Sequence, residues 1–441
     1  MKRSRNIFYL NAMVIALIVM MAQQKHSMAE TCPCDIYATG GTPCVAAHST
    51  VRALYGTYKG PLYQVRRQSD NKTKDIGVLT PGGFANAAAQ DSFLAGTSGT
   101  ISIIYDQSGK NNHLKKAPGG GYVPTADNEA VAKALGLYVG GHKVYGVHIV
   151  PGTGYRNDTT SGIATGDQPE SEYMVTSGNF YNNRCCFDYG NAETDNHDDG
   201  NGTMEAIYFG NNKQWGYGSG NGPWVMADLE NGLWAGATTP NNNNTPVTNT
   251  FVTAMVIGRS GTFALKAGNT QSGTLKILWD GARPNNTYNP MKKQGAIILG
   301  IGGDNSNSGQ GNFFEGAMAS GASSNATDSA VQANIVAAGY GITTAAVPHA
   351  DPGRPASAIT VRYNLSNTEA VLSFTLTDSR RVSVNILNLQ GRQIASVVSG
   401  NISAGSHEVV WDAKRIPAGV YVWRIAIDEH TEWIRNIIMG K

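Results

Sequence analysis

The chain has 441 residues, a formal net charge of only +2, and few charged residues, at 15%. Its 53 glycines and many asparagine, serine and threonine residues favour short strands joined by turns, and argue against a coiled coil or a disordered chain. No basic block occurs, so nucleic acid is not an expected partner, and the length predicts two to three domains.

Residues 1–29 have the pattern of an export signal. Basic residues within the first five positions precede an apolar run at 7–22, and the small residues Ser27 and Ala29 predict cleavage after Ala29. A membrane anchor is the alternative, but the run is shorter than the roughly 20 residues that a span needs, and Asn11 interrupts it. We therefore expect a secreted protein, extracellular or on the cell surface, without a membrane span.

Export allows disulfides, and five cysteines are present: Cys32, Cys34, Cys44, Cys185 and Cys186. The odd count leaves one thiol over. Cys34 with Cys44 would close a short loop. Cys185 and Cys186 are adjacent, and consecutive Cα atoms lie about 3.8 Å apart across a trans peptide, whereas ordinary disulfides prefer roughly 4.4–6.8 Å.

A bond between these adjacent cysteines would be strained, and strain tends to persist at functional sites. Two reduced, packed thiols are the alternative. No second Cys or His pair stands at ligand spacing, so we expect no metal site.

Residues 31–344 have the pattern of an all-β domain, because apolar stretches of strand length alternate with turns rich in glycine and asparagine. The clearest stretches are Ile101–Tyr105, Glu205–Phe209, Phe251–Ile257 and Ala296–Ile301. Two further stretches are predicted to be helical: Ala46–Tyr55, and Asp328–Ala338 with Thr327 as its cap. The expected fold is a β-sandwich with few helices.

A linker and a second small domain are predicted to follow. Residues 345–357 are rich in proline, glycine and alanine and form the expected linker. Residues 358–441 have the size of an immunoglobulin-like β-sandwich and contain no obvious catalytic cluster. The strands expected there are Val371–Leu376, Val382–Leu387, Glu408–Trp411 and Val420–Ile427.

One expected strand presents acidic and aromatic side chains together. The stretch Trp224–Glu230 alternates, and side chains two apart in a strand share a face. The apolar residues at 225, 227 and 229 would face the core, whereas Asp228 and Glu230 would point the other way with Trp224. Carboxylates bind sugar hydroxyls or attack an anomeric carbon, and a tryptophan packs on sugar C–H groups. This face is therefore a candidate sugar site, and a solvated acidic face is the alternative.

Asp304 is a second acidic candidate. It follows the apolar stretch at 296–301 in a turn where Gly302 and Gly303 let the backbone approach a ligand closely. An ordinary Asx turn is the alternative.

Other acidic residues compete with these candidates. We expect Asp106 to be structural, in a turn at a strand end, and Glu315 to be either a core-edge residue or an acid. The loop Asp195–Asp199 lacks the spacing of a calcium site and is expected to be solvated.

The motifs of several other enzyme classes are missing. The chain contains no GxSxG elbow, HExxH helix or phosphate-binding loop. Serine-nucleophile, zinc and nucleotide chemistry are therefore unsupported, and no cofactor is expected. Paired carboxylates in an exported β-protein with aromatic residues nearby favour glycoside hydrolysis.

Long stretches spread over residues 34–340 resemble the catalytic domain of the glycoside hydrolase family 54 α-L-arabinofuranosidases. They are Cys34–Tyr55, Ile103–Leu114, Tyr145–Asp158, Cys185–Thr194, Trp215–Asn231, Gly281–Met291 and Gly295–Asn307. The resemblance implies a concanavalin-like β-sandwich that removes terminal, non-reducing α-L-arabinofuranose with retention. The implied partners are plant cell-wall arabinan and arabinoxylan, or arabino-oligosaccharides.

The resemblance also implies residue roles. Glu230, in the D-x-E-N match, corresponds to the nucleophile, and Asp304, in GGDN, to the general acid/base. Sugar-binding positions are matched by Asp228, Asn231, Trp215 and, through its backbone, Gly303. Cys185 and Cys186 match an adjacent disulfide that lines the pocket, so the expected disulfides are Cys34–Cys44 and Cys185–Cys186.

The chain departs from the family in three places. Leu94 and Gly99 stand where a family disulfide would be, and Cys32 is an extra cysteine. The C-terminal segment resembles the immunoglobulin-like sorting domains of some Gram-negative bacterial secreted proteins, which implies a bacterial origin and contact with secretion machinery. The stretches that carry this second resemblance are Val382–Ile394, Pro417–Ile425 and Ile434–Lys441.

The implied mechanism has two displacements. Ionised Glu230 attacks the anomeric carbon while protonated Asp304 gives its proton to the leaving oxygen, and Asp304 then acts as base on water. Retention predicts carboxyl groups about 5–5.5 Å apart. Two alternatives stay open: a non-catalytic arabinan-binding lectin on the same sandwich, and a hydrolase of another furanoside or pentoside.

Overall fold

The computed structural model describes residues 31–341 and, in the C-terminal part, residues 362–365, 369–376, 379–388, 393–412, 419–427 and 430–438. The expected export signal and linker lie outside the described residues, so cleavage after Ala29, secretion and the linker at 345–357 stay predictions. No helix among the described residues is both long and apolar enough to cross a membrane.

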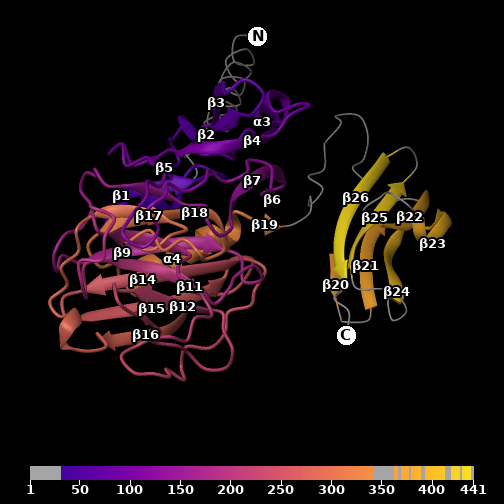
Figure 1. Ribbon diagram of the computed structural model, residues 1–441. Helices are drawn as coiled ribbons and strands as arrows, with labels where there is room; N and C mark the ends of the chain where they lie inside the picture. The colour runs from indigo at the N-terminus through magenta and orange to yellow at the C-terminus, as the bar shows by residue number, and fades with distance from the viewer. Residues whose placement is uncertain are drawn as a thin grey trace, which may run out of the picture.

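Residues 31–341 form two large, mainly antiparallel sheets whose strands lie side by side in Figure 1. The nine-stranded sheet runs in the order β16 (Lys276–Ala282), β15 (Thr262–Asn269), β14 (Val252–Arg259), β9 (Glu170–Thr176), β18 (Gly311–Ser320), β7 (His142–Ile149), β6 (Leu135–Val139) and β19 (Tyr340–Gly341), with β1 (Cys44–Ser49) paired to β18. The ten-stranded sheet runs in the order β13 (Leu233–Trp234), β12 (Trp224–Asp228), β11 (Glu205–Gly210), β10 (Asp188–Ala192), β17 (Ala296–Leu299), β8 (Tyr155–Asn157), β5 (Leu114–Lys116), β4 (Gly99–Ile104), β2 (Pro61–Arg67) and β3 (Thr73–Gly77).

The core between the sheets follows from alternation along the strands. On β12, Val225 and Ala227 join the main core, which also contains side chains of β14 and β15. Trp224 and Met226 belong to a separate cluster on the opposite face of the same strand. Successive side chains of a strand point to opposite faces, so one strand supplies both the sandwich core and a second buried layer.

The all-β prediction is confirmed, and the apolar stretches named from the sequence fall in β4, β11, β14 and β17. The helix expected at Ala46–Tyr55 is wrong. Residues 44–49 form β1, which pairs antiparallel with β18 and is buried along its whole length. A strand that is covered on both faces has a largely apolar sequence without alternation, and such a sequence cannot be distinguished from a buried helix by its periodicity.

The second expected helix is confirmed with a different start, but Thr327, the expected cap, lies inside the helix. Helix α4 spans Asn325–Ala337, and its cap is Ser324, whose hydroxyl accepts a hydrogen bond from the backbone N–H of Thr327 at 3.1 Å. Two short helices were not expected, α2 (Pro33–Thr39) and α3 (Ala87–Phe93). A 3-10 turn, η1, covers Asn286–Tyr288.

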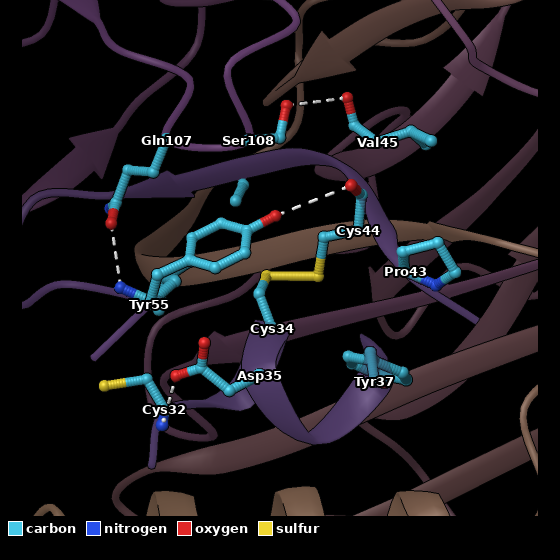
Figure 2. The surroundings of a disulfide bond; sticks show 12 residues. Cys32, Cys34, Asp35, Tyr37, Pro43, Cys44, Val45, Tyr55, Gln107 and Ser108 are labelled. Carbon is cyan, nitrogen blue, oxygen red and sulfur yellow. Dashed lines mark hydrogen bonds between the residues drawn. A yellow bond between two sulfur atoms is a disulfide. The ribbon is translucent and has the colours of Figure 1, made fainter. Parts of the chain in front are cut away.

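The predicted Cys34–Cys44 disulfide is present and joins α2 to β1 (Figure 2). The hydroxyl of Tyr55 donates to the carbonyl oxygen of Cys44 at 3.5 Å beside it. Cys32 precedes α2, is buried, and takes part in no disulfide. Its backbone N–H donates to the Asp35 carboxylate at 3.0 Å, an interaction that Figure 2 draws.

The described C-terminal residues form seven strands in two antiparallel sheets. One sheet contains β20 (Arg362–Leu365), β21 (Glu369–Leu376) and β24 (Gly405–Asp412); the other contains β23 (Gln393–Ile402), β22 (Arg380–Asn388), β25 (Gly419–Ile427) and β26 (His430–Ile438). The four strands named from the sequence are among them. The immunoglobulin-like topology and the sorting role of residues 358–441 stay predictions.

A buried ion-pair network lies between the sheets of the larger domain. The Lys293 ammonium contacts Glu170 of β9 at 2.8 Å and Glu205 of β11 at 2.9 Å, and Arg283 contacts Glu205 at 2.8 Å. All four side chains are at most 3% exposed. Because β9 and β11 belong to different sheets, Lys293 links the two layers electrostatically.

We expect Lys293→Met to destabilise the domain by about 3–5 kcal/mol, because it leaves two buried carboxylates without their shared cation. The matched control is Lys143→Met, which removes the exposed 2.7 Å pair with Asp91 and should cost less than about 1 kcal/mol. The measurement is urea unfolding followed by tryptophan fluorescence. Equal losses in the two variants would contradict the role of Lys293.

Candidate active site

A cavity of about 320 Å³ gathers side chains from loops and strand ends of the ten-stranded sheet. Its lining includes Tyr122, Arg184, Cys185, Asp198, Gln214, Trp215, Asp228, Glu230, Asn231, Gly303, Asp304 and Ser306. Of the site residues predicted from the sequence, only Cys186 is not part of this lining, since it is buried beneath the wall. Residues as distant along the chain as Tyr122 and Ser306 therefore meet in one place.

Asp228 and Glu230 reach the cavity from the end of β12. Asp228 does so by the strand alternation expected from the sequence, on the face of Trp224 and Met226, whereas Glu230 does not. The strand ends at Asp228, and both Glu230 and Asn231 have positive φ values, 62° and 52°. The backbone N–H of Glu230 donates to the Asp228 carboxylate at 3.2 Å. A left-handed turn closed by this bond, rather than a continued strand, brings the Glu230 carboxyl into the site.

The Gly302–Gly303–Asp304 turn forms the facing wall. A β-carbon on Gly303 would stand 1.9 Å from Oε2 of Glu193 and 3.0 Å from Oε2 of Glu230, so a side chain there would displace the Glu193 carboxyl. The Arg156 guanidinium donates to the Gly303 carbonyl oxygen at 2.6 Å and fixes the turn.

Asp304 itself is half-buried, and its Oδ1 accepts the backbone N–H of Ser306 at 2.9 Å. Asp304 thus makes the ordinary Asx turn considered from the sequence, and it also lines the cavity.

Cys185 and Cys186 form the adjacent disulfide predicted from the sequence. Their peptide bond is cis, with Cα atoms 2.9 Å apart, whereas the sequence argument assumed a trans peptide. Sγ of Cys186 lies 3.5 Å from Oδ2 of Asp228, and the hydroxyl of Ser306 lies 3.6 Å from Sγ of Cys185. These sulfur atoms and the Asp228 carboxylate lie within 4.8 Å of one another. Metal ligation requires thiolates, which a disulfide does not offer.

Trp215 and Asn231 occupy the sides of the cavity. Trp215 is half-buried and packs against the cluster that contains Cys186 and Trp224, so one part of its ring stays accessible. The Asn231 amide donates to Asp198 at 2.9 Å. The loop at 195–199 is largely exposed, as predicted, but Asp198 also reaches the cavity wall, which the sequence pattern did not indicate.

The competing acids have structural partners elsewhere. Asp106 accepts backbone N–H groups of Ala47, Ser108 and Asn112 at 2.8–3.0 Å, which confirms a structural turn. Glu315 is buried in the core, where Arg52 binds it through two nitrogens at 2.6 and 2.7 Å. Neither residue lines the cavity.

Three neighbours of the site were not predicted. Tyr122, which is 67% exposed, stands at the cavity mouth, and its backbone N–H donates to the Asp304 carbonyl oxygen at 3.0 Å. Glu193 and Asp188 are fully buried next to Glu230 and Asp228. The sequence signal for Asp188 and Glu193 was the stretch CCFDYGNAE at 185–193, in which two acidic residues lie among apolar and small residues. Such surroundings indicate that the two acids are buried.

Burial dominates the electrostatics of this acidic cluster. Burial, with Glu193 and Asp228 nearby, raises the pKa of Glu230 to about 11. Burial also raises the pKa of Asp228 to about 7 and raises the pKa values of Asp188 and Glu193. Carboxyl groups this close cannot all be ionised, because each charge lacks water and repels the next. This cluster of carboxyl groups therefore holds protons at neutral pH.

We expect Glu230→Gln to stabilise the ligand-free protein at neutral pH. Folding keeps a proton on Glu230 that the unfolded chain loses above about pH 4.3, so this group lowers stability increasingly as pH rises. Replacing it should raise the melting temperature at about pH 7.5, by about 2–4 °C for each kcal/mol of stability gained. The gain should shrink near about pH 4, where the unfolded chain also keeps the proton. The measurement is calorimetry across pH. Asp195→Asn on the exposed neighbouring loop is the control, and a gain independent of pH would contradict the argument.

Comparison with known proteins identifies relatives of the chain. A probable α-L-arabinofuranosidase B of Aspergillus fumigatus is 60% identical over 314 residues, which cover 70% of this chain and 62% of the relative. An arabinofuranosidase/B-xylosidase of Trichoderma koningii is 57% identical over 322 residues, 72% of this chain and 64% of the relative. The chain thus spans less than two thirds of the length of these relatives.

Solved structures agree with the fold. An arabinofuranosidase complexed with arabinofuranosyl-α-1,2-xylobiose has a TM-score of 0.71 at 40% identity, covering 93% of this chain and 86% of the other. A family 54 α-L-arabinofuranosidase soaked with a cyclic sulfate inhibitor has a TM-score of 0.70 at 46% identity, covering 85% and 75%. The family model described as "Alpha-L-arabinofuranosidase B, catalytic" matches residues 33–341. Because that match covers well over half of this chain, the chain belongs to the family of α-L-arabinofuranosidase B catalytic domains.

Proposed function

We propose that the chain is a retaining, exo-acting α-L-arabinofuranosidase that releases terminal arabinofuranose from arabinan or arabinoxylan. In this proposal Glu230 is the nucleophile and Asp304 the general acid/base. The observation that carries it is the shared cavity, in which both carboxyl groups line one space together with Asp228, Trp215 and Cys185. Paired carboxyls around an aromatic-sided cavity are the arrangement that glycoside hydrolysis requires.

The size of the cavity supports exo action on a single sugar. At about 320 Å³ it lies at the small end of ligand sites. A terminal pentose fits such a space. Tyr122, exposed at the mouth beside Asp304, stands where the leaving part of the substrate would emerge.

The relatives support the substrate class. The Aspergillus fumigatus relative is named an α-L-arabinofuranosidase, and a solved relative holds arabinofuranosyl-α-1,2-xylobiose. The residue roles come from the motif resemblance, D-x-E-N for Glu230 and GGDN for Asp304, and the cavity lining is consistent with them.

The proposed reaction has two steps. Glu230, once ionised, attacks the anomeric carbon, and protonated Asp304 gives its proton to the leaving oxygen, which forms a glycosyl ester on Glu230. Asp304, now ionised, takes a proton from water as that water attacks the anomeric carbon and expels the Glu230 carboxylate, and this restores both carboxyl groups. The half-exposed position of Asp304 gives it access to the incoming water.

The remaining wall residues would hold the sugar. The Asp228 carboxylate and the Asn231 amide can hydrogen-bond sugar hydroxyls, and the accessible face of Trp215 can cover the C–H groups of the ring. The Cys185–Cys186 disulfide offers a rigid, apolar floor against Asp228. Gly303 leaves space at the point where Glu193 and Glu230 approach it.

A second candidate activity is hydrolysis of β-xylosides, because the Trichoderma koningii relative carries both names. The test of the function is therefore a panel of 4-nitrophenyl glycosides. We expect fastest turnover of the α-L-arabinofuranoside, with release of the retained anomer seen by proton NMR, and slower turnover of the β-D-xyloside and β-D-galactofuranoside. No turnover by folded protein would favour the lectin alternative, and the inverted anomer would overturn the two-step mechanism.

Alanine substitutions test the two roles separately. Glu230→Ala should lower kcat by at least about 10³-fold, because no nucleophile remains. Asp304→Ala should lower it by about 10²–10⁴-fold, and less for substrates with good leaving groups. Added azide should restore turnover in both variants, giving the inverted glycosyl azide with the first and the retained one with the second. Asp195→Ala is the control, and wild-type activity in either active-site variant would refute that residue's role.

A further inference from the structure

The fully buried carboxyl of Glu193 lies in contact with the active-site wall. Glu193 directly follows β10, and its Oε1 accepts a hydrogen bond from the Thr203 hydroxyl at 2.6 Å. Its Oε2 is buried and has no hydrogen-bond donor among the described residues. A buried acceptor left without a donor is costly, so this oxygen requires a proton or a ligand.

The structure shows what that oxygen faces. Oε2 of Glu193 and Oε2 of Glu230 both lie within 3.0 Å of the point where a β-carbon on Gly303 would stand. The two carboxyl groups are within hydrogen-bonding distance of each other. Two ionised carboxylates at this separation repel strongly, whereas a single proton between them makes a hydrogen bond and leaves one charge on the pair.

We propose that Glu193 is a positioning residue for Glu230, carrying the proton that the two carboxyl groups share and donating that O–H to Glu230 as Glu230 attacks. This inference rests on the proposed function, because it gives Glu193 a task only if Glu230 is the nucleophile. Glu193 does not touch the reacting carbon and acts through Glu230 alone.

The proton balance is closed within the pair. Without a sugar the proton lies mainly on Glu230, whose pKa is raised to about 11, and Glu193 accepts it. When the sugar binds, the proton moves to Glu193, and Glu230 attacks as the carboxylate. In the glycosyl ester the Glu193 O–H hydrogen-bonds the ester carbonyl oxygen of Glu230, and after hydrolysis Glu230 leaves as the carboxylate beside the same proton.

The surroundings favour one charge on the pair rather than two. The charged and titratable groups that act on the two residues are Arg156, Asp188, Asp198, Asp228 and Tyr288, and Asp304 acts on Asp228. Arg156 is the cation among them, and it donates to the backbone carbonyl oxygens of Glu193 and Gly303 rather than to either carboxyl. With further acids around it, a doubly ionised pair is disfavoured by both repulsion and burial.

Two variants of Glu193 separate hydrogen-bond donation from packing. Glu193→Gln keeps an N–H donor toward Glu230, whereas Glu193→Met keeps the length of the side chain and removes the donor. The measurement is kcat/KM for 4-nitrophenyl α-L-arabinofuranoside across pH, with the melting temperature of each variant alongside.

We expect Glu193→Met to move the acidic limb of the kcat/KM profile to higher pH by about one unit or more. The reason is that the Glu230 carboxylate stays buried without its hydrogen-bond donor. Activity should recover in part as pH rises. Glu193→Gln should keep the wild-type limb to within about half a unit, since the amide donates in place of the acid.

Several outcomes would overturn the proposal. A limb that stays in place in Glu193→Met, or moves to lower pH, means that Glu193 does not donate to the reactive carboxylate. A limb displaced as far in Glu193→Gln as in Glu193→Met leads to the same conclusion. If kcat/KM of Glu193→Met falls by the same factor at every pH and its melting temperature is lower, Glu193 has a structural role only.

A spectroscopic measurement covers the case in which Glu193→Met fails to fold. Infrared difference spectra of wild type against Glu193→Gln at neutral pH should show one protonated carboxyl band lost in the variant. An unchanged band would refute the shared proton. Failure of the proposed function is distinguishable, because wild-type protein would then show no arabinofuranosidase turnover at any pH.

Discussion

The burial of carboxyl groups within a two-sheet domain is the constraint on which the arrangement of this protein depends. Acidic side chains lie inside on both sheets: Glu170 on β9, Glu205 on β11, and Asp188 and Asp228 on β10 and β12. Removing a carboxylate from water is expensive unless a counter-charge, a donor or a proton compensates it. Each buried acid in this domain therefore requires a cation, a hydrogen-bond donor or a bound proton next to it.

The domain compensates its buried acids in two different ways. Between the sheets, Lys293 and Arg283 neutralise Glu170 and Glu205 and tie the layers together. At the cavity the neighbours of Glu230 are mostly further acids, so the charge there is reduced by protonation. The first solution gives a rigid platform, and the second leaves carboxyl groups that can exchange protons, which suits acid–base chemistry at a sugar.

The position of the reactive groups depends on a few backbone features. The left-handed turn at Glu230 and Asn231 ends β12 and directs the Glu230 carboxyl into the cavity. Gly303 supplies the opposite wall, and its missing side chain leaves room for the Glu193 carboxyl. Arg156 holds that wall from behind. Substitutions at these supporting positions should therefore disturb the site as effectively as changes to the carboxyl groups themselves.

The sequence by itself determined the all-β class, most of the named strands, the existence of helix α4 and the Cys34–Cys44 disulfide, since these follow from the pattern of apolar and polar residues and from local spacing. Motif resemblance also found Glu230 and Asp304, which share the cavity. Only the tertiary structure decided that residues 44–49 are a strand, that Glu315 is paired with Arg52, and that Glu193 faces Glu230. These outcomes depend on contacts with residues far away along the chain. A local sequence pattern indicates that a side chain is buried, but it does not identify the residues that surround it.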